Sequence, residues 1–397
     1  MLEDMIRKNE ENNGRKRIEE IAEADYKSKV EMKEKEEQYY QQKIEELGIK
    51  PIDRLLKYLP EPSKYIKKGI TFAHQDFEII AKALANEEPF AVISGLSPTG
   101  PLHFGHKVIF DELLWLQKLG GEIFIPLTND EAYVVGKSRS LKQARECAYK
   151  EVIPSIIAFG FDPKKTKIFV DSDYKDIYNA AMHFSRDLTL TKAKGVFGFE
   201  GTDAPGLLFY RGAVQLAQIL LPQLKEFNGP KATLVPVGID QHPYILLSRD
   251  IAKKRKLVPP AAIYIRFLNS LKGPQNKMSA SDPQSCIFLS DSQKVAEEKI
   301  KNAFTGGSPL AEFQKKRGGV PEVCSVYSLL NYHFLDQNEA KEFYEQCRKG
   351  ELMCGHCKER AIKLVTAYIR DHQEKRKTAK TKIKDFLLDV PLKSFLE

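Results

Sequence analysis

The sequence predicts an α/β protein with a parallel sheet, followed by a mostly helical C-terminal domain. From about residue 88, short β-rich runs alternate with stretches of helical apolar spacing, which is the pattern of βαβ units. After Asp291 the strand-like runs cease and helical spacing continues. The length of 397 residues and the hydrophobic fraction of 42% suit two or three packed domains.

The elements follow from local periodicity and from turn residues. Residues 1–48 are almost all charged or polar, so we expect a long solvated helical arm or a partly disordered one. Residues 49–87 form an appended segment, and residues 272–285 form a loop rich in Gly, Pro, Asn and Ser. The predicted strands are 90–94, 122–127, 167–170, 232–237 and 262–267, and the predicted helices are 106–119, 139–159, 242–256, 292–304, 323–334, 338–348 and 357–388.

The charge is unevenly distributed along the chain. The net charge is +8, but residues 1–50 hold 11 Lys/Arg against 14 Asp/Glu, whereas residues 358–397 hold 11 against 6. A basic body indicates a polyanionic partner, although a solvated helical face gives the same pattern. No run approaches the length of a membrane span, and the N-terminus lacks the apolar region of a secretory signal. We therefore expect a soluble, cytoplasmic protein with no membrane partner.

The first motif is "SGLSPTGPLHFGH" (94–106), between a predicted strand and a predicted helix. His103 and His106 lie three apart, on one face of the first helical turn. A helix N-terminus presents unpaired N–H groups and a positive dipole end, which suit phosphate. Gly95 and Gly105 allow a ligand to approach the backbone closely. The same residues also suit an ordinary helix cap.

The second motif is "KMSAS" (277–281), in the predicted loop. Lys277 can act as a point charge on phosphate, and the hydroxyls and loop N–H groups can donate to phosphate oxygens. The alternative is an ordinary polar loop that contains one lysine.

HxGH after a strand together with a later KMSxS resembles the signature of class I aminoacyl-tRNA synthetases. "GIDQHPYILLSRD" (238–250), "KMSASDP" and "GELMCGHC" resemble segments of the archaeal and eukaryotic tryptophanyl-tRNA synthetases. The resemblance runs from about Phe72 to Phe386 and leaves residues 1–48 outside.

The resemblance implies a Rossmann-type catalytic domain at 88–290, a dimerisation insertion around 171–230, and an α-helical anticodon-binding domain at 291–397. It implies a homodimer that binds tryptophan, ATP with Mg²⁺, and tRNA(Trp). The tryptophan carboxylate attacks the α-phosphate in line, so alignment and charge stabilisation replace a protein nucleophile. The residues implied are His103, His106, Lys277 and Ser279 for catalysis, and Gly95, Gly105, Gly238, Asp240, Met278 and Ser281 for ATP.

The amino-acid pocket matches the family in part. Glu131, Gln215 and Gln241 match residues that hold the amino acid, with Glu131 suited to the α-ammonium. Ile93 and Pro126 stand where this branch carries a Tyr and a Gln that read the indole N–H, and neither side chain accepts a hydrogen bond. An unpaired buried indole N–H costs about 1–3 kcal/mol. A related synthetase for another amino acid, tyrosine first, and a non-catalytic tRNA-binding homologue are therefore the alternatives.

Four of the six cysteines, Cys324, Cys347, Cys354 and Cys357, have the spacing C-x22-C-x6-C-x2-C. "CGHC" lacks the preceding strand of a thioredoxin-like redox motif. Four thiolates suit Zn²⁺ or a [4Fe–4S] cluster, and four unconnected buried cysteines are the simpler reading. The resemblance favours the cluster, beside a tRNA-binding surface of Arg370, Lys375, Arg376 and Lys377.

Overall fold

The computed structural model describes the backbone of residues 2–394 and the side chains from Arg17 onward. The chain forms two compact units. The sheet unit comprises residues 44–266, 288–290 and 370–397, and the helical unit comprises residues 1–43, 267–287 and 291–369. These limits do not coincide with the predicted boundaries at residues 88 and 290, because residues 44–87 belong to the sheet unit and residues 267–287 to the helical unit. Helices α1 (Leu2–Leu47) and α17 (Cys354–Ala379) each continue from one unit into the other.

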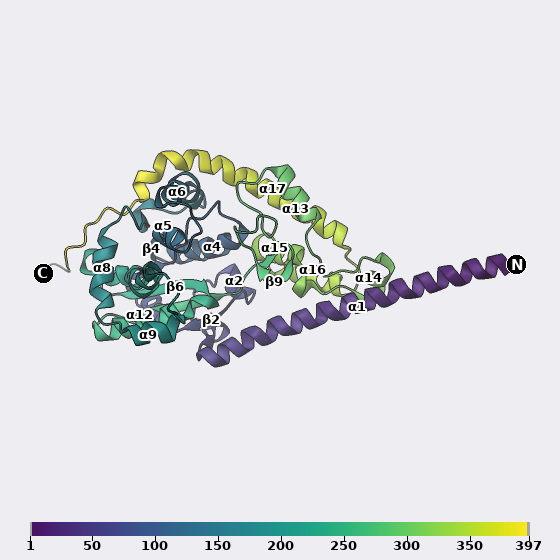
Figure 1. Cartoon of the computed structure of the whole chain (residues 1–397), viewed down its shortest axis with the longest axis horizontal. Helices are drawn as coiled ribbons and strands as arrows, with labels where there is room; N and C mark the ends of the chain where they lie inside the picture. Colours follow the sequence, from purple (N-terminus) through teal and green to yellow (C-terminus); the bar gives the residue numbers. More distant parts are fainter. Residues whose placement is uncertain (1, 395–397) are drawn as a thin grey trace. The chain divides into compact units, whose positions relative to one another are not determined.

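A seven-stranded sheet forms the centre of the sheet unit, in the order β1-β2-β7-β6-β3-β4-β5 (Figure 1). The strands are β1 (Lys50–Pro51), β2 (Thr71–Gln75), β3 (Phe90–Ile93), β4 (Glu122–Leu127), β5 (Thr166–Val170), β6 (Ala232–Gly238) and β7 (Ala261–Ile265). Strands β3 to β7 pair in parallel and coincide with the five predicted runs, so the predicted parallel sheet is confirmed. Strands β1 and β2 extend it in antiparallel fashion and were not predicted, because "TFAHQ" mixes polar with apolar residues.

The strand order creates a topological switch point between β3 and β6. From β3 the chain moves outward to β4 and β5, and it then returns to the other side of β3 for β6 and β7. Loops that leave the two central strands diverge, so ligands bind outside the carboxyl ends of such sheets at this point. The HxGH turn follows β3, and residues 238–241 comprise the last residue of β6 and the turn after it. Topology therefore brings these two segments to one edge.

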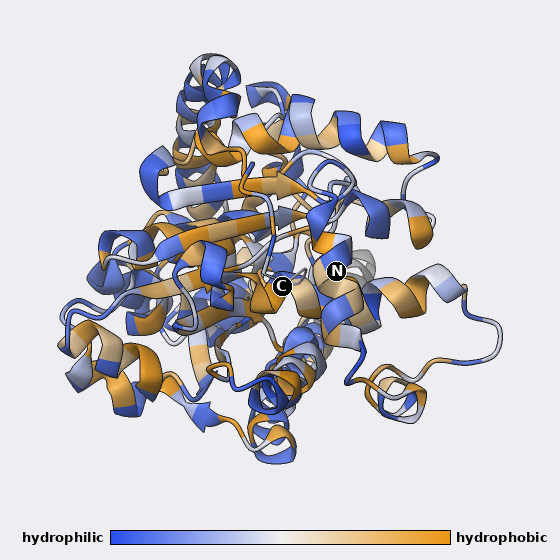
Figure 2. Ribbon diagram, turned by 90° about the vertical axis from the view of Figure 1, so that its left-hand side faces the viewer, coloured by the Kyte–Doolittle hydropathy of each residue, from blue (hydrophilic) through white to orange (hydrophobic). Residues whose placement is uncertain are grey.

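The helices of the sheet unit surround these strands. They are α2 (Lys64–Lys67), α3 (Glu78–Ala85), α4 (Phe104–Lys118), α5 (Asn129–Val134), α6 (Leu141–Cys147), α7 (Ile153–Ile157), α8 (Asp176–Ser185), α9 (Leu190–Phe197), α10 (Pro205–Phe209), α11 (Gln215–Leu220) and α12 (His242–Lys254). The predicted helix at 139–159 is α6 and α7 joined by a π-helical turn. Hydrophobic residues concentrate on the strands, whereas the helices alternate between hydrophobic and hydrophilic residues (Figure 2).

The helical unit contains one hairpin and six helices or parts of helices among its described residues. The hairpin is β8 (Asn269–Ser270) and β9 (Gly273–Lys277), and the helices besides α1 and α17 are α13 (Gln293–Lys301), α14 (Ala311–Arg317), α15 (Ser325–His333) and α16 (Gln337–Arg348). The hairpin corrects the prediction that 272–285 is a loop throughout. The short strand β9 was not predicted, because its Gly, Pro and Asn residues are typical of loops and its side chains are largely exposed. None of the described helices has the length and apolar character needed to cross a membrane.

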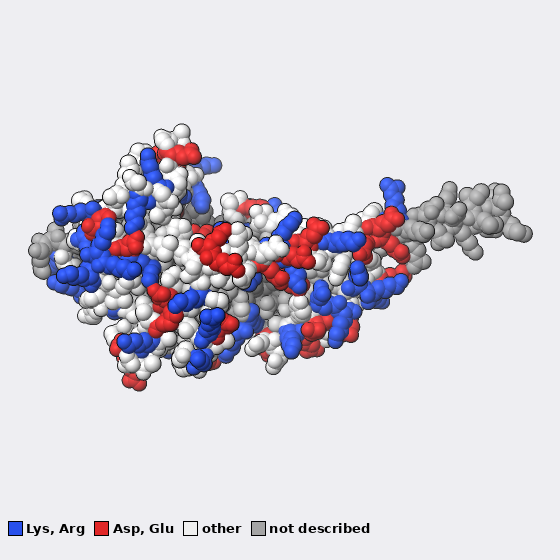
Figure 3. Space-filling view, turned by 90° about the horizontal axis from the view of Figure 1, so that it is seen from below, with Lys and Arg blue, Asp and Glu red and all other residues white. Residues whose placement is uncertain are grey.

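Helix α1 has the helical form that the sequence predicts for the charged arm, and one face of it is docked along part of its length. Ala22, Lys29 and Tyr40 are buried at 1%, 6% and 4% exposure. Lysine and tyrosine bury their stems and rings while their polar ends find partners, so a docked face of these residues has little hydrophobic periodicity. Acidic and basic side chains are interspersed over the face drawn in Figure 3.

Candidate active site

The turn after β3 makes close backbone contacts and hydrogen bonds with the two neighbouring strands, β4 and β6. A Cβ on Gly95 would lie 2.1 Å from the Pro126 carbonyl oxygen of β4, so only glycine fits there. The next residue continues the parallel pairing, because the Leu96 N–H donates to Pro126 O at 3.2 Å and Leu96 O accepts from the Thr128 N–H at 3.1 Å. On the other side, Ser94 Oγ donates to Pro236 O of β6 at 2.8 Å. The sequence predicted Gly95 for ligand approach, and the structure shows that the strand packing itself requires it.

His103 and His106 form the N-terminal cap of α4. His103 is the cap residue, with φ −122° and ψ 172°. The Gly105 N–H donates to His103 Nδ1 at 3.1 Å, and the His103 N–H donates to His106 Nδ1 at 3.2 Å. The ring centroids lie 3.8 Å apart. Because each Nδ1 accepts, a neutral ring carries its proton on Nε2, and Nε2–H is the donor that can meet a phosphate. The cap alternative and the phosphate role are thus compatible.

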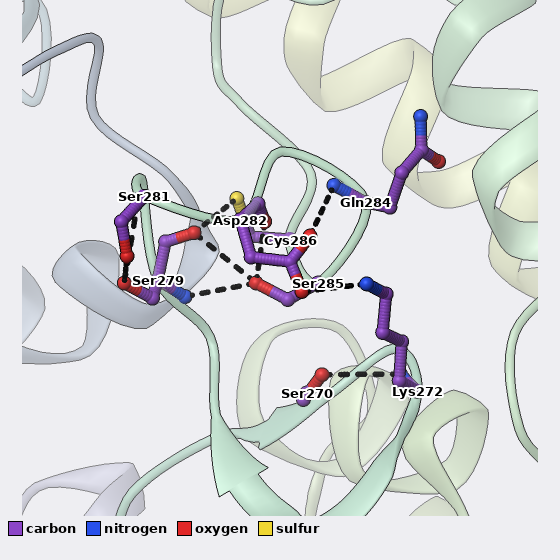
Figure 4. A network of polar contacts seen from close by, with 8 residues as sticks. All are labelled: Ser270, Lys272, Ser279, Ser281, Asp282, Gln284, Ser285 and Cys286. Carbon is purple, nitrogen blue, oxygen red and sulfur yellow. Dashed lines mark hydrogen bonds and ion pairs between the residues drawn. The ribbon is translucent and has the colours of Figure 1, made fainter.

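The KMSAS segment follows β9 in the helical unit and is braced by hydrogen bonds (Figure 4). The Ser279 N–H donates to Ser285 Oγ at 3.1 Å, and Ser285 Oγ donates to Asp282 O at 2.6 Å. The Ser279 and Ser281 hydroxyls lie 2.8 Å apart. The Asp282 carboxylate pairs with Lys272 at 2.6 Å, which ties the turn to the hairpin. This bracing fixes the hydroxyls that the sequence predicts for phosphate.

Met278 takes part in this segment differently from its neighbours. Its side chain is only 4% exposed, and its N–H donates to Leu268 O at 3.2 Å. The side chain therefore anchors the segment in the core, and only its backbone remains suited to the predicted ATP contact.

The three residues predicted for the amino acid lie at the ends of elements in the sheet unit. Glu131 in α5 follows β4, and its Oε2 accepts from Thr128 Oγ1 at 3.0 Å. Burial raises the pKa of Glu131, while the Lys137 and Arg211 charges oppose that rise. Gln215 begins α11, and its Nε2 donates to Gln241 Oε1 at 3.1 Å. The structure thus brings Gln215 and Gln241 into contact.

A second polar group beside these residues was missed in the sequence. Asp171, directly after β5, is fully buried, and burial together with the Asp130 carboxylate raises its pKa well above the usual value. Gln218 Nε2 donates to Asp171 Oδ2 at 2.6 Å. Gln218 is 3% exposed and lies one helical turn after Gln215. Two features of the sequence could have indicated this group: Asp171 directly follows a predicted strand, and Gln215 and Gln218 are three residues apart.

The four clustered cysteines gather in the helical unit. Cys324 caps α15, Cys347 lies in the last turn of α16, and Cys354 and Cys357 lie in the first turn of α17. Burial and the neighbouring thiols Cys324 and Cys354 raise the pKa of Cys347 to about 12. Burial and the other three thiols likewise raise the pKa of Cys357. The four sulfurs are therefore electrostatic neighbours.

Glycine backbones lie against the sulfurs. A Cβ on Gly307 would lie 2.3 Å from Cys354 Sγ, and a Cβ on Gly319 would lie 2.8 Å from Cys347 Sγ. Among the described residues, however, no three Cys, His, Asp or Glu side chains surround a point where one metal ion would bind. The thiols gather without converging on a single centre.

The basic residues predicted for tRNA lie at the end of α17 and differ in their surroundings. Arg376 Nη2 pairs with Glu151 at 2.5 Å and donates to Lys150 O at 3.0 Å, and its side chain is 16% exposed. Lys375 and Lys377 are exposed, and each pairs with an acidic neighbour on the same helix. Burial lowers the pKa of His372 to about 4, and its Nε2 lies 2.8 Å from Ser155 Oγ. Arg376 and His372 therefore fasten this helix end within the sheet unit.

Helix α4, which carries the histidine cap, is fastened at Glu112. This carboxyl is fully buried; Oε1 accepts from Ser63 Oγ at 2.9 Å and from the Thr71 hydroxyl, while no described side chain donates to Oε2. Burial raises the pKa of Glu112 to about 7, against the two hydroxyl donors and Lys64, with Asp111 adding to the rise.

Comparisons with known proteins agree on one family. A family profile described as class I tRNA synthetases (W and Y) matches residues 85–369. The chain is 42% identical over 347 residues to a tryptophan–tRNA ligase of Methanocaldococcus jannaschii, which covers 86% of this chain and 93% of that protein. It is 36% identical to the tryptophan–tRNA ligase of Pyrobaculum aerophilum, with coverages of 89% and 95%.

Solved structures give the same relationship. The crystal structure of tryptophanyl-tRNA synthetase from Aeropyrum pernix K1 matches with a TM-score of 0.82 and 35% identity, over 89% of this chain and 97% of that chain. The tryptophanyl-tRNA synthetase of Giardia lamblia matches with a TM-score of 0.82 and 27% identity.

Replacing Glu112 with Gln should remove part of the pH dependence of stability. The native carboxyl holds its proton up to about pH 7, whereas the unfolded one releases it near 4.5. Native protein therefore binds more protons in this window, and its free energy of unfolding falls as the pH rises from 4.5 to 7 and stays lower above. Denaturant unfolding at pH 5 and pH 8 should show Glu112→Gln gaining roughly 2–3 kcal/mol on the wild type at the higher pH. Glu61→Gln, which changes an exposed carboxyl, should keep the same difference in stability from the wild type at both pH values. If the free energy of unfolding of Glu112→Gln depended on pH as strongly as that of the wild type, this account would be wrong.

Proposed function

The chain belongs to the tryptophan–tRNA ligases of the class I (W and Y) tRNA synthetases, and on this basis we propose how its residues carry out the reaction. The enzyme activates tryptophan with ATP to tryptophanyl-adenylate and transfers the tryptophanyl group to tRNA. One observation carries this conclusion: the similarity to tryptophan–tRNA ligases spans nearly the full length of those proteins, and the family match at 85–369 contains both motifs. The free thiols suit a cytoplasmic enzyme.

Activation needs alignment and positive charge rather than a protein nucleophile. ATP is taken with Mg²⁺, which neutralises phosphate charge. We assign His103 and His106 to donate Nε2–H groups to the phosphates, aided by the N-terminal dipole of α4. Lys277 and the Ser279 hydroxyl meet the charge that grows on the leaving pyrophosphate. Gly95, Gly105, Gly238, Asp240, Ser281 and the Met278 backbone bind the rest of ATP.

Tryptophan is held at the carboxyl ends of β4 and β6. Glu131 pairs with the α-ammonium, whose charge offsets the burial that raises the pKa of this carboxyl. Gln215 and Gln241 bind the remaining polar atoms.

Gln218 accepts the hydrogen bond from the indole N–H of tryptophan. Its Nε2 is committed to Asp171, so its orientation is fixed with Oε1 as the remaining acceptor. No described residue donates a hydrogen bond to that oxygen. This acceptor replaces the pair that Ile93 and Pro126 cannot supply.

The four cysteines would hold a [4Fe–4S] cluster, with Zn²⁺ as the alternative, because four neighbouring thiols with a CxxC core suit either group. The bound group would supply the positive charge that four neighbouring thiolates need. Gly307 and Gly319 allow the Cys354 and Cys347 sulfurs to lie against the backbone.

Arg370, Lys375 and Lys377 are the proposed tRNA contacts of α17. Arg376 is omitted, because its side chain is only 16% exposed and is held by Glu151 within the sheet unit.

The enzyme forms a homodimer through the insertion at 171–230. Met182, Leu190 and Phe209 in this segment are 70%, 55% and 47% exposed, and exposed apolar residues of this size favour an interface. A groove of about 310 Å³ beside Leu190 and Phe209 supports the same placement.

The test of substrate is ATP–pyrophosphate exchange with each of the twenty amino acids. Tryptophan should stimulate exchange well above tyrosine and phenylalanine. Gln218→Met should raise the KM for tryptophan by about 5- to 100-fold and leave the KM for ATP unchanged, because a buried N–H loses its acceptor. Stimulation by another amino acid with none by tryptophan would reject the substrate, and an unchanged tryptophan KM in Gln218→Met would reject only the indole reader.

Lys277→Ala should lower kcat for exchange on the order of 10²-fold while tryptophan binding changes little, because its charge acts mainly in the transition state. Lys301→Ala removes an exposed surface lysine of α13 and should behave as wild type. A normal exchange rate in purified Lys277→Ala would remove this lysine from the catalytic set.

Cys354→Ser should lose iron and tRNA charging but keep most tryptophan-dependent exchange, because activation uses residues outside the cysteine group. Anaerobically purified wild type should contain iron and absorb broadly at about 400 nm. Cys147→Ser, outside the group, should retain both properties. Bound zinc without this absorption would overturn the cluster.

A further inference from the structure

Helix α1 docks onto the helical unit through one stripe of residues. The buried positions Ala22, Lys29 and Tyr40 are seven and eleven residues apart, spacings of about two and three helical turns that place them on one face of the helix. Lys29 Nζ donates to Gly307 O and pairs with Asp25, both at 2.7 Å. Further along, Lys33 pairs with Glu322 at 2.7 Å. These contacts fix α1 as part of the unit.

The docked face of α1 ends at Tyr40, which contacts Phe267, two residues before the β8–β9 hairpin that leads into KMSAS. The Phe267 N–H donates to Tyr40 Oη of α1 at 3.2 Å, and Phe267 O accepts from Tyr332 Oη of α15 at 3.3 Å. Tyr40 is 4% exposed. Two tyrosine hydroxyls therefore hold the backbone of Phe267, one on its N–H and the other on its carbonyl.

The Phe267 ring also contacts the ammonium group of Lys277. Lys277 Nζ lies 4.5 Å from the centroid of the Phe267 ring, a distance typical of cation–π attraction. The two strands lie side by side, with Asn269 opposite Lys277, and Leu268 O accepts from the Met278 N–H at 3.2 Å. The position of Phe267 thus sets the position of the lysine.

Beside this contact, α1 and β9 are separated by a groove of about 480 Å³ lined on one side by Lys35, Tyr39 and Tyr40 and on the other by residues 274–277. Lys277 therefore has room to leave the ring, while the base of the hairpin is held.

We propose that α1 positions the KMSAS lysine: Tyr40 fixes Phe267, and Phe267 holds the Lys277 ammonium at a defined place between turnovers. This inference rests on the proposed catalytic role of Lys277. A cation–π contact is weak compared with a charge-assisted bond to phosphate, so the ammonium moves to ATP when ATP is bound. Because Tyr40 and Tyr332 hold the backbone of Phe267 beside the hairpin, the Lys277 side chain has fewer conformations available before ATP binds. Tyr40 and Phe267 are positioning residues and need not touch substrate.

The test is a double-mutant cycle in pyrophosphate exchange with the full-length enzyme. Tyr40→Phe removes one hydroxyl and should lower kcat about 3- to 10-fold, with the KM for tryptophan unchanged. Tyr39→Phe makes the same chemical change on the neighbouring residue, which is 42% exposed, and should behave as wild type. In a Lys277→Ala background, Tyr40→Phe should cause no further loss, because it acts through that lysine.

The outcomes separate this inference from the function on which it rests. Normal exchange in Lys277→Ala would reject the role of the lysine and this inference with it. A loss in Lys277→Ala without a loss in Tyr40→Phe would reject only the role of α1. Equal losses from Tyr40→Phe in both backgrounds would also reject it, since the effect would then not pass through Lys277. Should Tyr40→Phe fold poorly, Phe267→Leu removes the ring and must show the same dependence on Lys277.

Discussion

The active site depends on a backbone contact that only glycine allows. After β3 the chain passes so close to the Pro126 carbonyl of β4 that a Cβ on Gly95 would lie 2.1 Å from it. This approach lets Leu96 continue the parallel pairing with β4, and the chain then reaches the start of α4. This contact therefore leads the chain to the histidine cap and the positive dipole end of α4, which follow β3 at the switch point that the strand order creates.

Buried charge is arranged around that contact in two ways. Glu131 and Asp171 stand at the carboxyl ends of β4 and β5, and burial raises the pKa of each. An ammonium can offset the cost of ionising Glu131, whereas Asp171, whose pKa is raised by burial and by the Asp130 carboxylate, accepts the Gln218 Nε2–H and orients that amide. Glu112 connects α4 to Ser63 and Thr71 through a buried carboxyl, and burial raises its pKa to about 7. In the sheet unit, Asp171 and Glu112 thus act as structural hydrogen-bond partners, and Glu131 is the buried carboxyl proposed for the substrate ammonium.

In the helical unit, polar contacts add to apolar packing such as that of the buried Met278 side chain. The KMSAS segment is held by the Ser285 hydroxyl and by the pair of Lys272 with Asp282. Polar partners also hold α1, through Lys29 and Tyr40. Such contacts fix position with little buried apolar area, so they can hold a segment in place and still allow one side chain to move.

By itself the sequence determined the parallel strands β3 to β7, the main helices, both motifs and the family, because hydrophobic periodicity and glycine-containing motifs are local properties. Tertiary structure alone decided that β1 and β2 join the sheet, that Arg376 pairs with Glu151, that Gln218 is oriented by Asp171, and that α1 docks through Lys29 and Tyr40. The first is a backbone pairing of strands distant in sequence, and the other three depend on contacts between distant polar residues. Such residues show no period in the sequence, since the partner that makes their burial favourable is supplied only by folding.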